Sequence, residues 1–176
     1  MSAILSHKLL LAVALQVAIL LGIVAMKYTV LAYGTQVLVR IAPIEPTDPL
    51  RGDYALFRLT DFEHLEVPAY TNLRAGNTVW VPIEKRGTYD APAGIPSLHE
   101  PPGLSLRGTV TRVDAGANAA LRNVHLRYGL EQYYIPERTA QRRPFPTGTE
   151  VYARIAIDSA GNAVVKEIQA NGKPWP

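Results

Sequence analysis

The feature that most constrains this chain is the apolar segment Leu9–Met26 near its amino terminus. Only Gln16 and Gly22 interrupt it, and Lys8 and Lys27 bracket it. As a helix it would be about 27 Å long, close to the thickness of the hydrocarbon core of a bilayer. Polar residues do not recur every three or four positions, so a helix that lies flat on a membrane fits poorly. The segment therefore predicts a retained transmembrane anchor.

Two other interpretations of this segment stay open. In a cleaved signal peptide, His7 and Lys8 would form the charged region, and cleavage would fall near Val30–Ala32. That site lacks the usual small residue at the third position before the cut, and the apolar segment is longer than the hydrophobic region of a typical signal peptide. In a soluble protein, the same residues would form a buried helix.

The rest of the chain has the composition of a globular domain. Its 176 residues suffice for one domain and an anchor, so we expect a cytoplasmic tip and anchor at residues 1–32 and one β domain at residues 33–176. The sequence has no cysteine, which excludes disulfides, thiolate catalysis and cysteine zinc sites. The net charge is only +3 and the basic residues are scattered, so we expect no nucleic-acid partner.

The residues after the anchor predict an all-β fold of about seven or eight short strands, arranged as a sandwich or a barrel. The clearest hairpin is the last one, where the strands 151–157 and 163–168 flank a turn. Asn171-Gly172 predicts a further tight turn. The other strands are expected at residues 35–41, 54–59, 77–83, 106–113, 124–128 and 132–135, the last two as a candidate pair.

Three stretches predict irregular structure. Pro43, Pro46 and Pro49 oppose a regular strand, because proline fixes φ and donates no hydrogen bond. Residues 61–68 predict a short helical turn or a loop. Residues 86–103 are rich in proline and glycine and predict a long irregular segment, which in a compact domain is usually functional, disordered or in contact with a partner.

Two blocks of sequence carry a resemblance to a known family. The first, Pro46–Tyr54, ends in Gly-Asp-Tyr at the entrance to a predicted strand. The second, Tyr128–Glu137, follows the pattern Tyr-Gly-x-Glu-x-aromatic-x-x-Pro-Glu. With the final hairpin, these blocks resemble the GDYXXLXY proteins, which are small bacterial membrane-anchored proteins named after the first motif. Phe57 and Leu59 stand where that name has Leu and Tyr.

The resemblance implies a single-pass protein of the bacterial inner membrane with a cytoplasmic amino terminus and a periplasmic β domain. Charge does not set this orientation, because Lys8 and the amino terminus oppose Lys27 and Arg40. Proteins of the family are often encoded beside polytopic membrane proteins of the DUF2157 and DUF4401 types. Such a protein, together with the lipid bilayer, is therefore the expected partner. The family has no established activity, and we expect no cofactor.

The two blocks also supply the candidate binding residues. Gly52 tolerates positive φ and Asp53 can accept hydrogen bonds from nearby backbone amides, which is typical of a structural turn that sets the register of a strand. Alternatively, Arg51, Asp53, Glu131 and Glu137 approach one another across strands and bind a ligand or a partner loop. The full candidate set is Arg51, Gly52, Asp53, Tyr54, Tyr128, Glu131, Tyr134 and Glu137.

No complete catalytic set is visible in the sequence, and we expect no catalytic residues. His64, His99 and His125 lack the spacing of helical metal ligands, so no metal site is expected. A membrane-bound peptidase would need a serine nucleophile and a lysine base, for which Ser97, Ser105 and Lys85 are poorly placed. The leading expectation is a non-catalytic accessory subunit of a polytopic partner. The alternatives are an envelope ligand-binding module and, more remotely, a peptidase-like enzyme.

Overall fold

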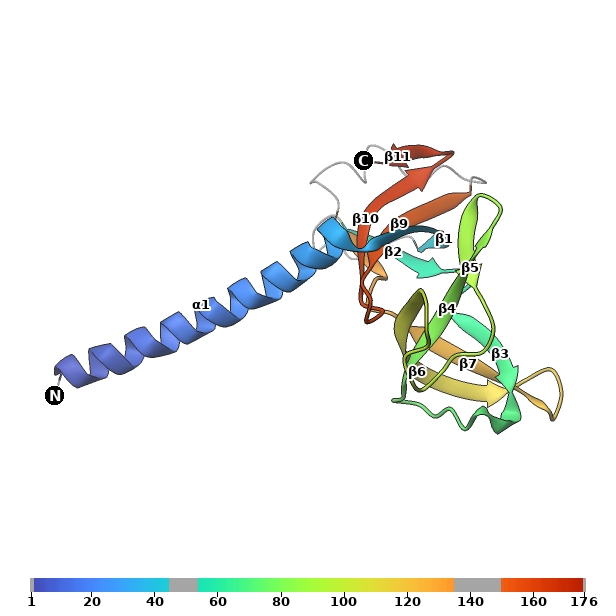
Figure 1. Ribbon diagram of the computed structural model, residues 1–176, viewed down its shortest axis with the longest axis horizontal. Helices are drawn as coiled ribbons and strands as arrows, with labels where there is room; N and C mark the ends of the chain where they lie inside the picture. Colours follow the sequence, from blue (N-terminus) through green and yellow to red (C-terminus); the bar gives the residue numbers. More distant parts are fainter. Residues whose placement is uncertain (1, 45–53, 135–149, 176) are drawn as a thin grey trace.

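The computed structural model describes residues 2–44, 54–134 and 150–175. One long helix, α1 (Ser2–Tyr33), projects from a domain built of two curled β-sheets (Figure 1). We call the part that follows α1 the β domain. The all-β prediction is therefore confirmed, with one amino-terminal apolar helix.

The described residues form eleven strands, so the expected seven or eight was too few. One sheet has the order β11-β10-β9-β1-β2-β8 and the other the order β3-β7-β6-β4-β5. A single-turn helix, η1 (Ala69–Thr71), follows β3. The strands are β1 (Thr35–Ile44), β2 (Tyr54–Leu59), β3 (His64–Pro68), β4 (Thr78–Arg86), β5 (Tyr89–Pro92), β6 (Ser105–Ala115), β7 (Leu121–Arg127), β8 (Gln132–Tyr134), β9 (Val151–Ile157), β10 (Ala163–Ala170) and β11 (Lys173–Trp175).

One hydrophobic core lies between the two sheets, and the alternating residues predicted to share a face fill it. Val37, Val39 and Ile41 of β1 are buried in the same hydrophobic cluster as Val79 and Val81 of β4, which belongs to the other sheet. The last hairpin is also confirmed. Its turn is held by one carboxylate, that of Asp158, which accepts hydrogen bonds from the backbone amides of Ala160 and Asn162 at 3.0 and 2.8 Å.

Several strand boundaries differ from the expectation. Pro43 lies inside β1, where it pairs with Phe57 of β2. Within the described residues, the pairing of β1 with β9 ends at Ile41, so Pro43 lies beyond that ladder, near the end of β1, where proline is tolerated. Residues 64–68 form the edge strand β3 rather than a helical turn or loop. Within residues 86–103, β5 forms a hairpin with β4, so that segment is not irregular throughout.

The expected pairing of residues 124–128 with residues 132–135 is wrong. β7 pairs with β3 and β6 in one sheet, whereas β8 pairs with β2 in the other. The chain therefore crosses from one sheet to the other between Arg127 and Gln132. Sequence patterning did not separate a hairpin from such a crossover, because both need a turn between two short apolar strands.

The junction between α1 and the β domain is short and tightly packed. Every side chain from His7 to Thr29 is exposed, whereas Val30 is 5% exposed. Gly34, between α1 and β1, donates its N–H to the Val30 carbonyl at 2.8 Å. A side chain at Gly34 would lie 2.4 Å from that carbonyl oxygen and 2.9 Å from the amide nitrogen of Ile157. Residues 7–33 are long and apolar enough to span a membrane, a property that a signal sequence shares.

Candidate functional site

The two sequence blocks that suggested a binding site meet in the structure. β2 and β8 are antiparallel neighbours, and their register sets Tyr54 opposite Tyr134. The amide of Phe57 donates to the carbonyl of Glu131 at 3.1 Å and extends this contact by one step. Arg51, Gly52, Asp53 and Glu137 lie outside the described residues. The two blocks therefore meet through their backbones, while the approach of Arg51 and Asp53 to Glu131 and Glu137 stays a prediction.

The crossover turn, which we define as Tyr128–Glu131, is stabilised from within. Gly129 has a φ of +73°, a backbone conformation that side-chain-bearing residues rarely adopt, and Leu130 is buried in the core. The Glu131 carboxylate accepts a hydrogen bond from the Tyr128 amide at 2.7 Å. A carboxylate at this distance from a backbone N–H forms a strong charge-assisted hydrogen bond. Glu131, a candidate binding residue, thus has a structural partner in its own turn.

Tyr128 is also held on several sides. Its hydroxyl donates a hydrogen bond to the Phe62 carbonyl at 3.0 Å. Its ring packs edge to face against the Phe62 ring, with the ring centroids 6.1 Å apart. A Cβ at Gly108 would lie 2.7 Å from the Tyr128 ring, so only glycine leaves room for it. Burial, and to a smaller extent the nearby Glu131 carboxylate, raises the pKa of Tyr128 well above its ordinary value of 10.0.

This raised pKa predicts a loss of stability at alkaline pH. The phenol ionises in the unfolded chain near pH 10 but stays neutral in the folded domain, so its contribution is complete below pH 10 and falls as the pH rises further. We expect the free energy of unfolding to fall more steeply above pH 10 in the natural protein than in a Tyr128→Phe variant. Urea unfolding across this range measures the difference. Parallel pH profiles of the two proteins would contradict the prediction.

The crossover turn yields a second prediction. Glu131→Ala removes the acceptor of the Tyr128 amide and should lower the free energy of unfolding by about 1–2 kcal/mol. Glu131→Gln keeps an acceptor oxygen and should cost roughly half as much or less. Chemical denaturation of both variants tests this order. An Ala variant as stable as the natural protein would show that the hydrogen bond contributes nothing.

A groove with a volume of about 580 Å³ opens beside the crossover turn. Its polar wall includes Arg58, Glu63, Arg127, Glu131 and Gln132. Apolar side chains of β2 and β7 complete it. The candidate residues Tyr128 and Glu131 therefore border an opening in the surface, although each also has a structural partner.

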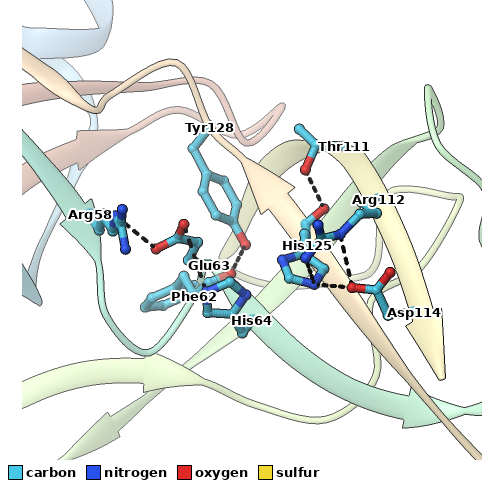
Figure 2. A network of polar contacts seen from close by, with 9 residues as sticks. All are labelled: Arg58, Phe62, Glu63, His64, Thr111, Arg112, Asp114, His125 and Tyr128. Carbon is cyan, nitrogen blue, oxygen red and sulfur yellow. Dashed lines mark hydrogen bonds and ion pairs between the residues drawn. The ribbon is translucent and has the colours of Figure 1, made fainter. Parts of the chain in front are cut away.

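A polar network borders this groove, with members on β2, β3, β6 and β7 and in the turn between β2 and β3 (Figure 2). The register of β3 with β7 sets His64 opposite His125, and their rings pack edge to face with the ring centroids 4.5 Å apart. Asp114 Oδ2 lies 2.9 Å from Nε2 of His125 and 2.8 Å from Nε of Arg112. On the other side, Glu63 lies between Arg58 and His64. The remaining members drawn in Figure 2 are Phe62, Thr111 and Tyr128.

The chemistry of this network is that of a cross-strand surface cluster. Both Asp114 and Arg112 are largely exposed, so their ion pair is screened by water. The Thr111 hydroxyl donates to the backbone carbonyl of His125 at 3.1 Å, not to its ring. Within residues 2–44, 54–134 and 150–175, no group of three or more His, Asp or Glu side chains is placed to hold a metal ion. The His64–His125 contact is not visible in the sequence, because only the β3–β7 pairing brings the two residues together.

Ser97 and Lys85, considered above for a peptidase, lie in the β5–β6 segment and on β4, respectively. The Ser97 hydroxyl accepts a hydrogen bond from the His99 amide at 3.1 Å, and its backbone pairs with Trp80. Lys85 is exposed on β4, opposite Asp90 of β5. Each of the two residues thus has a position in a local turn or strand pairing.

The comparisons with known proteins support the family resemblance that the two sequence blocks suggested. A family model described as GDYXXLXY protein matches residues 16–168, which include most of the apolar segment, both blocks and most of the final hairpin. Neither a curated protein nor a solved structure matches the chain. Because the match covers far more than half of the sequence, the chain belongs to the GDYXXLXY protein family.

Proposed function

We propose that α1 anchors this protein in the bacterial inner membrane and that its β domain, in the periplasm, is a non-catalytic accessory subunit of a polytopic membrane partner. One observation carries the proposal. The side chains from His7 to Thr29 are all exposed, although an 18-residue window within residues 7–33 has a mean hydropathy of 2.8. An apolar helical surface of this length needs lipid or other helices to cover it.

The packing of the last turn of α1 favours a retained anchor over a cleaved signal peptide. Val30 is 5% exposed and Gly34 is held against it, so the end of the helix belongs to the packing of the β domain. Cleavage near Ala32 would remove Val30 from this contact. Intact-mass measurement of the protein extracted from membranes should therefore give the uncleaved chain. A mature protein that begins near Tyr33 would contradict the anchor.

The accessory role depends on helices that pack against α1. Affinity purification in a mild detergent should recover a multi-pass protein, of the DUF2157 or DUF4401 type, with the natural chain. A matched control replaces Leu9–Met26 with an unrelated transmembrane helix, which keeps the anchor and changes the surface. Loss of the partner with this control would place the contact on α1. Recovery of the natural protein alone in several detergents would contradict the accessory role.

Orientation is tested separately. A reporter that is active only in the periplasm, fused after Pro176, should be active. Activity of a cytoplasmic reporter at the same position would instead place the β domain in the cytoplasm.

A second candidate function is binding of a small envelope ligand in the groove beside the crossover turn. The groove favours it because Arg58, Glu63 and Arg127 line one opening with Glu131 and Gln132. Of the candidate residues, Tyr128 and Glu131 line this groove, whereas a contribution of Arg51, Gly52, Asp53, Tyr54, Tyr134 and Glu137 to binding stays a prediction from the sequence. Titration with soluble muropeptides should change the intrinsic fluorescence of the natural protein and not that of an Arg58→Ala, Arg127→Ala variant. Equal responses would exclude this groove for that ligand class.

A further inference from the structure

Outside α1, exposed large hydrophobic side chains are rare in the described part of the chain. They are Tyr70, Ile95 and Leu98, which are 75%, 43% and 44% exposed. Ile95 and Leu98 lie in the segment between β5 and β6, residues 93–104, which we call the β5–β6 loop. Tyr70 lies in η1, which follows β3 directly, and β3 lies on the far side of the β domain from α1 (Figure 1). Two of the three are therefore gathered in one loop.

Contacts place this loop beside the end of α1. Its residues 100–104 line a groove of about 790 Å³ whose other walls are residues 26–35 of the helix junction and residues 157–159 of the last hairpin. Its Ser97 exchanges two backbone hydrogen bonds with Trp80, both at 2.9 Å. The Trp80 indole in turn donates to the Ala160 carbonyl at 3.0 Å, in the same hairpin turn. The loop therefore approaches the helix junction in two ways, through the shared groove and through Trp80.

The side chains around this junction have the composition of a membrane–water boundary. Tyr28 and Tyr33 are 66% and 85% exposed at the end of α1, after Lys27. Aromatic side chains with a polar edge concentrate at the headgroup level of transmembrane helices, and lysine marks the same level. No linker separates α1 from β1, because Gly34 alone lies between them. The β domain must therefore sit close to the surface from which α1 emerges.

We propose that the β5–β6 loop is a second membrane contact, in which Ile95 and Leu98 insert into the interfacial region of the leaflet that α1 leaves. The occupant of this surface is lipid, and the contact continues the one made by α1. This inference rests on the proposed anchoring of α1. Its consequence is that the β domain has one fixed face toward the bilayer, with β3 and η1 pointing away from it.

The absence of cysteine in the natural chain allows a direct test with the full-length protein. Single substitutions Ile95→Cys and Leu98→Cys carry an environment-sensitive NBD label in vesicles of phosphatidylethanolamine and phosphatidylglycerol. Tyr70→Cys is the matched control, since it is an exposed apolar position away from the helix junction. Leu15→Cys reports independently whether α1 is inserted. Both loop positions are partly exposed, so the label should not disturb the core.

We expect the labels at residues 95 and 98 to show blue-shifted emission and to be quenched by lipids with a shallow doxyl group. The label at residue 70 should instead be quenched by aqueous iodide. Iodide quenching at residues 95 and 98 equal to that at residue 70, with residue 15 protected, would overturn the loop contact and leave the anchor intact. Iodide quenching at residue 15 would overturn the anchor itself, and the loop contact with it.

Discussion

Phe57→Ala should destabilise the β domain by about 3–5 kcal/mol, among the largest effects expected of any single change. Phe57 is 1% exposed in the core, and its backbone pairs with Pro43 on one side and bonds to Glu131 on the other. Truncation of the phenyl ring would leave a cavity where β2 meets the crossover turn. A loss this large approaches the whole stability of a typical small domain.

The matched control is Phe57→Leu, which restores the residue of the family name. Leucine is smaller than phenylalanine but fills most of the same volume, so we expect a loss of about 1–1.5 kcal/mol. Thermal and urea unfolding of both variants in detergent give the two values. A leucine variant as unstable as the alanine variant would show that the shape of the phenyl ring, not its burial, is what the site requires.

Gly34→Val should separate α1 from the β domain. The new Cβ would meet the backbone oxygen of Val30 at 2.4 Å and the backbone nitrogen of Ile157 at 2.9 Å, and neither atom can rotate away. Relief requires the last turn of α1 to move from β9. The cost should be at least the roughly 1–3 kcal/mol of a typical overpacked site, and Gly34→Ala should show a smaller effect in the same direction.

Limited proteolysis at the junction and thermal unfolding measure this change. The control is Gly22→Val within α1, where an added Cβ would meet no atom within 4 Å. We expect Gly22→Val to leave the unfolding of the β domain and its proteolysis unchanged. Protection of the junction in the Gly34 variant equal to that in the Gly22 variant would show that the junction is more adaptable than its packing indicates.

The strands that the sequence predicted well are those with one buried face. β1, β4 and β9 alternate apolar and polar residues over several positions, because one side of each contacts the core. The strands that it missed are short or lie at edges. β3, β5 and β11 have three to five residues each, too few for alternation to stand out from a loop.

The candidate site, like the fold, could be predicted from the sequence only in part. Both blocks were recognised in the sequence, but their pairing through β2 and β8 was not predicted, because the sequence favoured residues 124–128 as the partner of residues 132–135. The partners of Tyr128 could not be predicted, since Phe62 contacts it from the turn between β2 and β3 and Gly108 contacts it from β6. The same holds for His64 and His125, whose contact depends on a register that local patterns do not specify.

The direct passage from α1 into β1 has a mechanical consequence. A helix that is longer than the hydrocarbon thickness around it tilts to match that thickness. With Gly34 alone between helix and strand and Val30 packed on the domain, such a tilt would turn the sheets with it rather than being absorbed by a flexible tether. In the proposed anchored state, β3, which lies far from α1 in Figure 1, would then change its position relative to the bilayer. Bilayer thickness, or the tilt that a partner imposes on α1, would set the direction in which this protein presents its outer face.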